Sequence, residues 1–153
     1  AAEELSALAP RQMLQLTSVY GLRAMAVLAG LEPGESITAS DLSAATRVPQ
    51  QYLSKVMRKL VVARLVRGRR GRNGGFQLAK PPRSVTIAMI LNALSHEIEG
   101  GCAFGFPACD PDHPCALHPI WSRLQQCVDS WSSEMTLADM DPSGRRVNRD
   151  PTS

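Results

Sequence analysis

The chain has no long hydrophobic run. None of its apolar stretches approaches the roughly 20 residues that a helix needs to cross a bilayer. Residues 1–12 (AAEELSALAPRQ) also lack the charged start and long apolar stretch of a secretory signal. We therefore expect a cytoplasmic protein with no membrane partner. At 153 residues, 44% of them hydrophobic, the chain is long enough for one compact domain with its own core.

Acidic residues are missing between Arg47 and Arg83. This segment holds eleven Lys and Arg and no Asp or Glu, although the formal charge of the whole chain is only +3. Up to Arg83 the chain has 13 basic and 5 acidic residues, and beyond it 4 and 9. A charge run is usually a solvated face. An unopposed run of this length favours a polyanionic partner, and nucleic acid rather than membrane, because no broad apolar face accompanies it.

Two catalytic motifs are missing as well. The sequence has no CxxC pair, which a thiol catalyst typically places at a helix start. Its Gly-rich stretch has no GxxxxGK[ST] pattern, so a nucleotide-binding loop is not expected there. An electron carrier would not need the basic segment. We therefore expect a binding protein and not an enzyme.

The basic segment begins inside a helix-turn-helix pattern. Residues 13–31 carry apolar side chains at three- and four-residue steps, which predicts a buried helix that EPGES ends. Thr38 or Ser40 can cap a short second helix, and Pro49 suits the first turn of a third. The apolar stripe of this third helix is Tyr52, Leu53, Val56, Met57 and Leu60. A short helix, a tight turn and a second helix are the parts of a helix-turn-helix.

Candidate DNA contacts lie on the third helix and on a basic hairpin after it. ARLVRGRR and GGFQLAK predict two short strands joined by a Gly-rich turn. The first turns of the helix offer amide, hydroxyl and ammonium groups for base edges in a major groove, and its later charges suit phosphates. The hairpin can contact the DNA backbone or the minor groove. The candidates are Gln50, Gln51, Ser54, Lys55, Arg58 and Lys59 on the helix and Arg69, Arg70, Arg72 and Asn73 on the hairpin.

Three of the four cysteines lie in CAFGFPACDPDHPCALH, between Cys102 and His118. In a reducing cytosol clustered cysteines are more often metal ligands or redox groups than a disulfide, which stays an alternative. The ligand pattern CxxxxxxCxxxxxCxxH comprises Cys102, Cys109, Cys115 and His118. Thiolates hold iron–sulfur clusters, and an imidazole can replace one of them. Zinc accepts the same donor set. His113 is expected to be a solvated loop residue.

Three stretches of the chain, YGLRAMAVLA, VPQQYLSKVMRKLVVARLVRGRRGRNGGFQLAKPP and VTIAMILNAL, resemble the Rrf2 family of bacterial winged-helix transcriptional regulators. The resemblance covers about residues 13–140. It implies a homodimer that binds double-stranded DNA, and so a palindromic operator. The matching DNA-binding positions are Gln51, Tyr52, Ser54, Lys55 and Arg70. Members of the IscR type carry an acid where this chain has Ser54, so their target sequence does not transfer.

The resemblance also bears on the cysteines. Family members with a cluster hold it on three cysteines at a related spacing, and the IscR type adds a histidine in CxxHxxW, which Cys115 to Trp121 matches. The aspartate of NsrR-type members corresponds to Val19. We therefore expect a 2Fe-2S cluster on Cys102, Cys109, Cys115 and His118, which would sense iron, redox state or nitric oxide. A 4Fe-4S cluster on three cysteines, a zinc site and a cluster-free repressor are the alternatives.

Apolar residues keep helical spacing from Leu117 to Met135. Cys127 lies on this stripe and is expected to be a small buried residue. The helix is too long and too apolar for one small domain to cover, and the resemblance implies that it pairs with a two-fold partner.

The expected fold is mainly α with a small β-hairpin wing: a winged helix-turn-helix followed by a long C-terminal dimerisation helix. The predicted segments are an N-terminal extension (1–12), the winged helix-turn-helix (13–83), a connecting helix (84–95), the cluster-binding loop (96–117), the dimerisation helix (118–140) and a polar tail (141–153).

Overall fold

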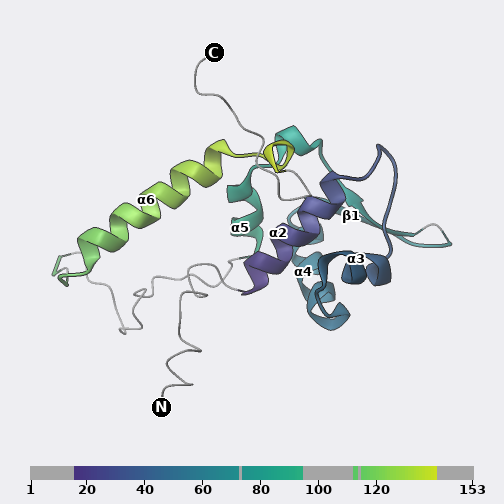
Figure 1. The fold of residues 1–153 in the computed structure, drawn as a ribbon, viewed down its shortest axis with the longest axis horizontal. Helices are drawn as coiled ribbons and strands as arrows, with labels where there is room; N and C mark the ends of the chain where they lie inside the picture. Colours follow the sequence, from purple (N-terminus) through teal and green to yellow (C-terminus); the bar gives the residue numbers. More distant parts are fainter. Residues whose placement is uncertain (1–15, 73, 95–111, 114, 141–153) are drawn as a thin grey trace.

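The computed structural model describes residues 16–72, 74–94, 112–113 and 115–140. These residues form a mainly helical protein with one two-stranded hairpin, as the sequence predicts (Figure 1). The elements are α2 (Leu16–Ala29), α3 (Ala39–Thr46), α4 (Gln50–Val62), β1 (Val66–Arg69), β2 (Gly75–Leu78), the 3₁₀ helix η1 (Pro82–Ser84), α5 (Ile87–Leu94), α6 (His118–Glu134) and the 3₁₀ helix η2 (Leu137–Asp139). Within the described part of the chain, no helix has the length and apolarity that spanning a bilayer requires.

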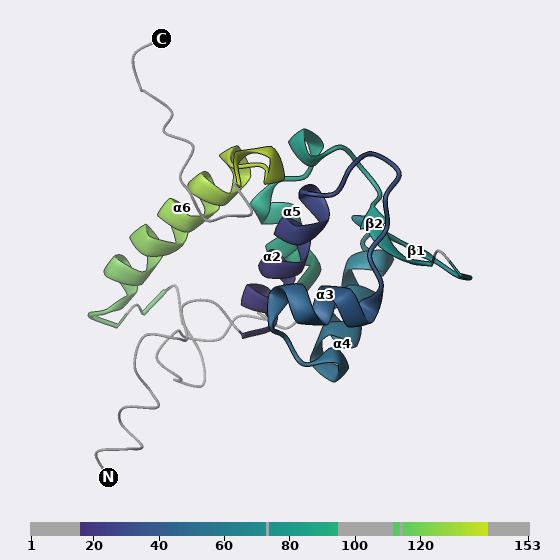
Figure 2. The same cartoon turned by 45° about the vertical axis from the view of Figure 1, so that its right-hand side comes forward.

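Helix α2 is the centre of the winged helix domain. It contacts α3, α4 and α5 and also β2, and Figure 2 shows it between α5 and α3. Its buried face is made of small and apolar residues, namely Ser18, Gly21, Ala24, Met25 and Leu28. Leu42, Met57 and Ile90 from the surrounding helices are fully buried against this core. Burying such a side chain stabilises a fold by about 1.5–3 kcal/mol, so these contacts hold the three helices in fixed positions.

The turn between α3 and α4 is held by side-chain hydrogen bonds. Ser43 Oγ donates to the Val48 carbonyl at 2.6 Å, and Thr46 Oγ1 donates to the Leu42 carbonyl at 2.7 Å. Arg47 ends α3 in the left-handed region, with φ 57°. Pro49 lies immediately before α4 as its N-cap residue, one position earlier than the sequence predicts, and its carbonyl accepts from the Leu53 amide. The two helices of the helix-turn-helix therefore meet at a constrained angle.

The hairpin is attached to the segment before α3. Strands β1 and β2 pair antiparallel, with Val66 opposite Leu78 and Arg69 opposite Gly75. Phe76 and Ile37 then exchange two backbone hydrogen bonds of 2.8 and 3.0 Å. Gly75 has φ 144°, and a Cβ at this position would collide with the Ile37 carbonyl. Glycine is therefore required at the base of the hairpin, where two backbones approach closely.

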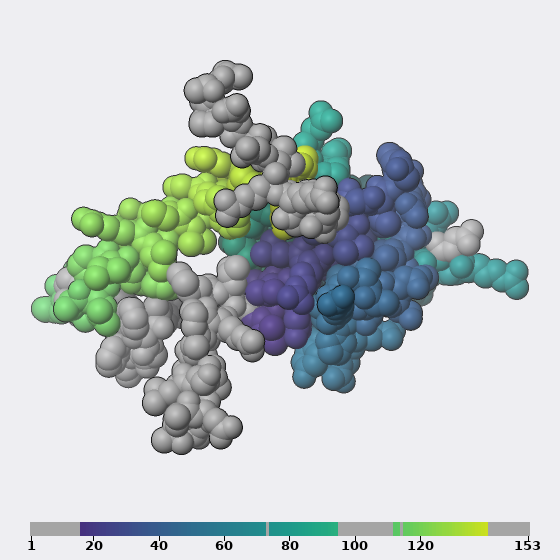
Figure 3. Space-filling view, in the orientation of Figure 1, coloured from purple at the N-terminus to yellow at the C-terminus, as the bar shows by residue number. Residues whose placement is uncertain are grey.

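Helix α6 is joined to the domain at its C-terminal end. Thr86 and Thr136 form an antiparallel bridge. On either side of it the Ile87 amide donates to the Met135 carbonyl and the Leu137 amide donates to the Val85 carbonyl, both at 2.9 Å. From this junction α6 projects as an arm whose first residue lies farthest from the domain (Figure 1 and, in space-filling form, Figure 3).

Four residues differ from the sequence-based expectation. Leu16 is 61% exposed and Tyr52 is 48% exposed, although both were expected on apolar stripes. Cys127 was expected to be buried and is exposed on the single chain, because it lies on the same side of α6 as the exposed Ile120 and Trp131. The dimerisation helix was expected to reach residue 140 but ends at Glu134, because Met135 adopts an extended backbone and pairs with the start of α5.

The cap of α3 provides a test of the fold. Thr38 Oγ1 accepts from the Asp41 amide at 3.1 Å and donates to Asp41 Oδ2 at 2.8 Å. The change Thr38→Ala leaves that amide without its partner and is expected to lower the free energy of unfolding by about 0.5–2 kcal/mol. Urea denaturation measures the loss. Ser40→Ala, in the same helical turn and also exposed, is the control, and an equal loss in both variants would contradict the assigned cap.

Candidate nucleic-acid interface

Helix α4 presents one face to the core and another to solvent. Leu53, Val56, Met57 and Leu60 are buried. The opposite face carries polar and basic residues that are all exposed, namely Gln50, Gln51, Ser54, Lys55 and Arg58. This is the arrangement that a recognition helix needs, because its polar side chains must reach base edges while the apolar ones fix the helix in place.

The hydroxyl of Ser54 is not available as a hydrogen-bond donor to a base, although its position in the sequence suggests that role. Its hydroxyl donates to the Gln50 carbonyl at 2.9 Å, one turn earlier in the helix. Because the proton is used within the helix, the side chain presents only acceptor capacity to the outside. The donors on this part of the outward face are therefore the neighbouring amides and cations, Gln51 and Lys55 among them.

Tyr52 and Lys59 lie on a flank of α4, seven residues apart. The Tyr52 ring packs against Tyr20 of α2, with ring centroids 6.4 Å apart and planes inclined by 49°. Lys59 Nζ donates to the Leu94 carbonyl of α5 at 3.4 Å. Lys59 is exposed, as the sequence predicts, but sequence reasoning did not find either contact. Spacing alone puts the two residues on one flank, but their partners depend on how α2 and α5 cross α4.

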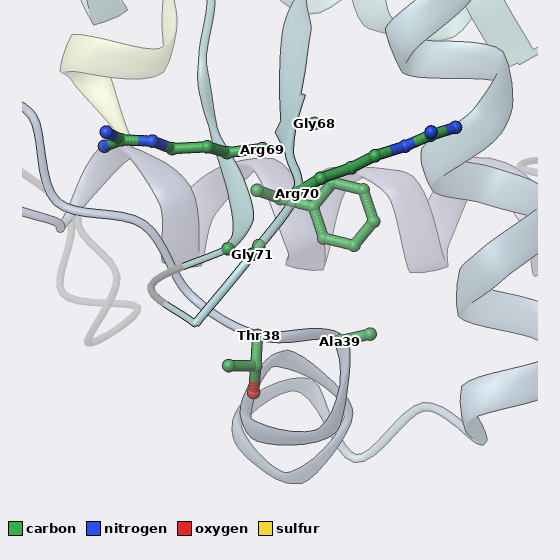
Figure 4. Close-up of a pocket in the computed structure, with 9 residues that line it drawn as sticks. Thr38, Ala39, Gly68, Arg69, Arg70 and Gly71 are labelled. Carbon is green, nitrogen blue, oxygen red and sulfur yellow. The ribbon is translucent and has the colours of Figure 1, made fainter.

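The hairpin extends the basic surface beyond α4. Arg69, Arg70 and Arg72 are exposed, and the side chains of Arg69 and Arg70 extend to opposite sides of the hairpin (Figure 4). An open hollow of about 440 Å³ lies between the hairpin and the start of α3, with Thr38, Arg69 and Phe76 among its lining residues. The predicted contact Asn73 lies outside the described residues. Arginines on both sides of a projecting hairpin can contact phosphates on either side of it.

Charge adds to this geometry. No acidic residue occurs in the sequence between Asp41 and Glu97, so the positive charges of α4 and the hairpin have no acidic neighbour along the chain. Their fields add over one side of the domain, which attracts the phosphate backbone of DNA.

Two of the four predicted metal donors lie in the described part of the chain. Cys115 is exposed, and His118 is the first residue of α6. The His118 amide donates to the Cys115 carbonyl at 3.0 Å, so the two residues share one turn. Cys102 and Cys109 fall among the residues that are not described. Within the ranges that are described, no three Cys, His, Asp or Glu side chains form a group that could hold a metal ion. His113 is exposed, as expected.

A family model described as an iron-dependent transcriptional regulator, Rrf2, matches residues 14–141. The chain belongs to the Rrf2 family. It is 34% identical over 122 residues to an HTH-type transcriptional regulator of Mycobacterium tuberculosis, which covers 79% of this chain and 76% of the relative. A Haemophilus influenzae regulator of the same type is 29% identical over 129 residues, which covers 83% and 86% of the two chains. This Rrf2 protein is therefore a DNA-binding transcriptional regulator and not an enzyme.

Solved structures support the fold. CymR, the global cysteine regulator of Bacillus subtilis, superposes with a TM-score of 0.71 at 23% identity and covers 86% of this chain and 98% of its own. IscR of T. potens superposes with a TM-score of 0.70 at 22% identity and covers 91% of each chain. At such identities the likeness establishes the winged-helix fold of the Rrf2 protein and nothing finer.

The outward face of α4 provides a test of the interface. A phosphate contact by Arg58 releases a counterion, so Arg58→Met is expected to reduce the slope of log affinity against log salt concentration by about one. The probe is a duplex selected from random-sequence DNA by the unchanged protein, and fluorescence anisotropy measures binding. Arg123→Met, at an exposed position on α6, is expected to keep the slope. An unchanged slope in Arg58→Met would remove Arg58 from the interface.

Proposed function

We propose that this Rrf2 protein is a homodimeric regulator that carries an iron–sulfur cluster on Cys102, Cys109, Cys115 and His118 and changes its affinity for a palindromic operator with the state of that cluster. The observation that carries the proposal is the position of the donor pair. Cys115 lies in the turn that leads into α6 and His118 is the first residue of α6, the helix that presents an uncovered apolar face farther along. A group bound by these two residues would therefore sit at the start of the helix whose apolar surface a second subunit would cover.

The donor set fits a cluster. Cys115 is exposed and so accessible to a metal, and His118 follows it three residues later, at the end of the turn that leads into α6. Two thiolates from Cys102 and Cys109 would complete the set. An iron–sulfur cluster supplies a centre that gains or loses an electron and that oxygen or nitric oxide can destroy. The imidazole of His118 would add a nitrogen ligand beside the three thiolates.

The apolar face of α6 supports a second subunit as the partner. Leu117, Ile120 and Trp131 are 42%, 68% and 48% exposed. Ile120, Cys127 and Trp131 follow at steps of seven and four residues, so they line one side of the helix. Trp121, Leu124 and Val128 on the adjoining side are partly buried. Large apolar side chains gathered along one helix mark an interaction surface, and pairing α6 with its own copy would give an isologous contact.

The junction of α6 with the domain supports transmission between the two sites. The backbone bridge at Thr86 and Thr136 fixes the end of α6 beside η1, which follows strand β2 of the hairpin directly. In a dimer, a shift of one α6 against the other would change the spacing of the two recognition helices. Two such helices fit a palindrome only when they lie about one turn of DNA apart, so the spacing sets the operator affinity.

Metal content tests the cluster. Protein purified without oxygen is expected to be coloured and to contain iron and acid-labile sulfide, and Cys115→Ala to lose most of both. Cys127→Ala removes the other described cysteine, which lies three turns farther along α6, and is expected to keep its colour. Mössbauer spectra distinguish the 2Fe-2S from the 4Fe-4S form. Colourless wild-type protein with one zinc per chain would reject the cluster and favour a structural zinc site.

The oligomeric state tests the interface. Ile120→Asp places a charge on the most exposed apolar residue of the uncovered face, and burying an unpaired carboxylate is costly. The variant is therefore expected to sediment as a monomer at concentrations where the wild type is a dimer. Gln126→Asp adds the same charge on the opposite side of α6 and is expected to leave the dimer intact. Wild-type protein that sediments as a monomer would reject this surface as a self-association site.

A further inference from the structure

Two arginines adopt the left-handed backbone conformation, one at each end of the recognition helix. Arg47 precedes α4 and has φ 57°, and Arg64 follows it and has φ 58°. In the part of the chain that the structure describes, they are the only non-glycine residues with a positive φ. A side chain disfavours this conformation because its Cβ approaches the following carbonyl oxygen, whereas glycine adopts it readily. A long charged side chain at such a position therefore needs an explanation.

The end of α4 explains the conformation of Arg64. The Arg64 amide donates to the Val61 carbonyl at 3.0 Å. The Leu65 amide donates to the Leu60 carbonyl, also at 3.0 Å. These are the two hydrogen bonds of a Schellman cap, which places the second residue after a helix in the left-handed region. Leu60 and Leu65 are both buried, as the apolar pair of such a cap usually is. Arg64 therefore belongs to the structure of the helix end.

The turn between α3 and α4 fixes the backbone of Arg47 but leaves its side chain unexplained. The residues on either side, Thr46 and Val48, are buried. Thr46 Oγ1 donates to the Leu42 carbonyl, and the Val48 carbonyl accepts from Ser43 Oγ. Arg47 itself is exposed, and its guanidinium forms no hydrogen bond or ion pair with another described residue. Glycine is common in the turn of a helix-turn-helix, so the turn alone does not require an arginine.

The position of Arg47 in the motif places it beside the DNA backbone. A recognition helix sets its N-terminal residues against base edges, and the helix before it crosses the backbone. Arg47 joins these two helices and lies three residues before Gln50, the first exposed polar residue of α4. Arg64 lies beyond the other end of α4, which has 13 residues and is roughly 20 Å long. The two arginines would therefore differ in their distance from the phosphates at the groove.

We infer that Arg47 is a phosphate contact of the DNA interface, kept in a backbone conformation that favours glycine because its charge is needed at the turn. Sequence reasoning did not include it among the DNA contacts. A guanidinium binds phosphate through paired N–H donors. Since the phosphates carry no sequence information, the contact adds affinity without adding preference for one operator. The inference rests on DNA binding alone and is independent of any metal on the cysteines.

The test compares Arg47→Met with Arg64→Met. Methionine keeps a long unbranched side chain on the left-handed backbone and removes the charge. Fluorescence anisotropy measures the affinity of each variant, purified in the same way as the wild type, for the selected duplex and for a random-sequence duplex over a range of salt concentrations. Arg47→Met is expected to reduce the slope of log affinity against log salt concentration by about one on both duplexes. Arg64→Met is expected to keep the slope.

The stability of the variants distinguishes a DNA contact from a structural cation. Arg47→Gly removes the charge and suits the left-handed backbone, so it is expected to raise the urea midpoint of unfolding while reducing the salt slope by about one. A cation that served only the C-terminal end of α3 would give another result: Arg47→Met would lower the midpoint and keep the slope, and the inference would be wrong. Circular dichroism checks that each variant is folded.

Two further outcomes would also overturn the inference. A loss of affinity confined to the selected duplex would make Arg47 a base contact, because phosphate contacts weaken binding to all sequences alike. An equal reduction of the slope in Arg64→Met would show that the net charge of the domain, and not the position of Arg47, determines the effect. Each of these results leaves the proposed metal site untouched, so failure here is distinct from failure of the proposed function.

Discussion

The backbone pairing of Val85–Ile87 with Met135–Leu137 is the contact on which the arrangement of the two parts of the molecule depends. It joins an arm of one helix to a domain whose other helices all pack on α2. The pairing is protected, because Leu137 is fully buried and Thr136 and Asp139 close a capping box around the turn. Buried hydrogen bonds of this kind are costly to break. The base of α6 is therefore held firmly against the domain.

Helix α4 divides its side chains between three environments, and this division explains how one short helix can serve both structure and recognition. Leu53 and its neighbours on the stripe are buried, Tyr52 and Lys59 are exposed but contact adjacent helices, and Gln51 and Arg58 are exposed on the outward face. A helix held on two sides loses little further freedom when DNA binds, so less of the binding energy is spent on ordering it. The outward residues are thus available for recognition alone.

Much of this architecture could be predicted from the sequence, because the signals involved are local. The spacing of Leu53, Val56 and Leu60, a cap at Thr38 or Ser40 and the Gly-rich turn predict the helix-turn-helix and the hairpin; the structure confirms both elements and assigns the cap to Thr38. The partners of Tyr52 and Lys59 could not be predicted, because they depend on how helices distant in sequence cross. The end of α6 was wrong for another reason: apolar Met135 continues the helical period, while its backbone is already engaged by the start of α5.

The length of α6 determines how a displacement at its tip relates to a rotation at its base. With 17 residues and a rise of 1.5 Å for each, α6 is roughly 25 Å long. A displacement of about 2 Å at its tip, where Cys115 and His118 lie, corresponds to a rotation of only about 5° at its base. A displacement of the donors at the tip of α6 would therefore reach the domain as a small rotation.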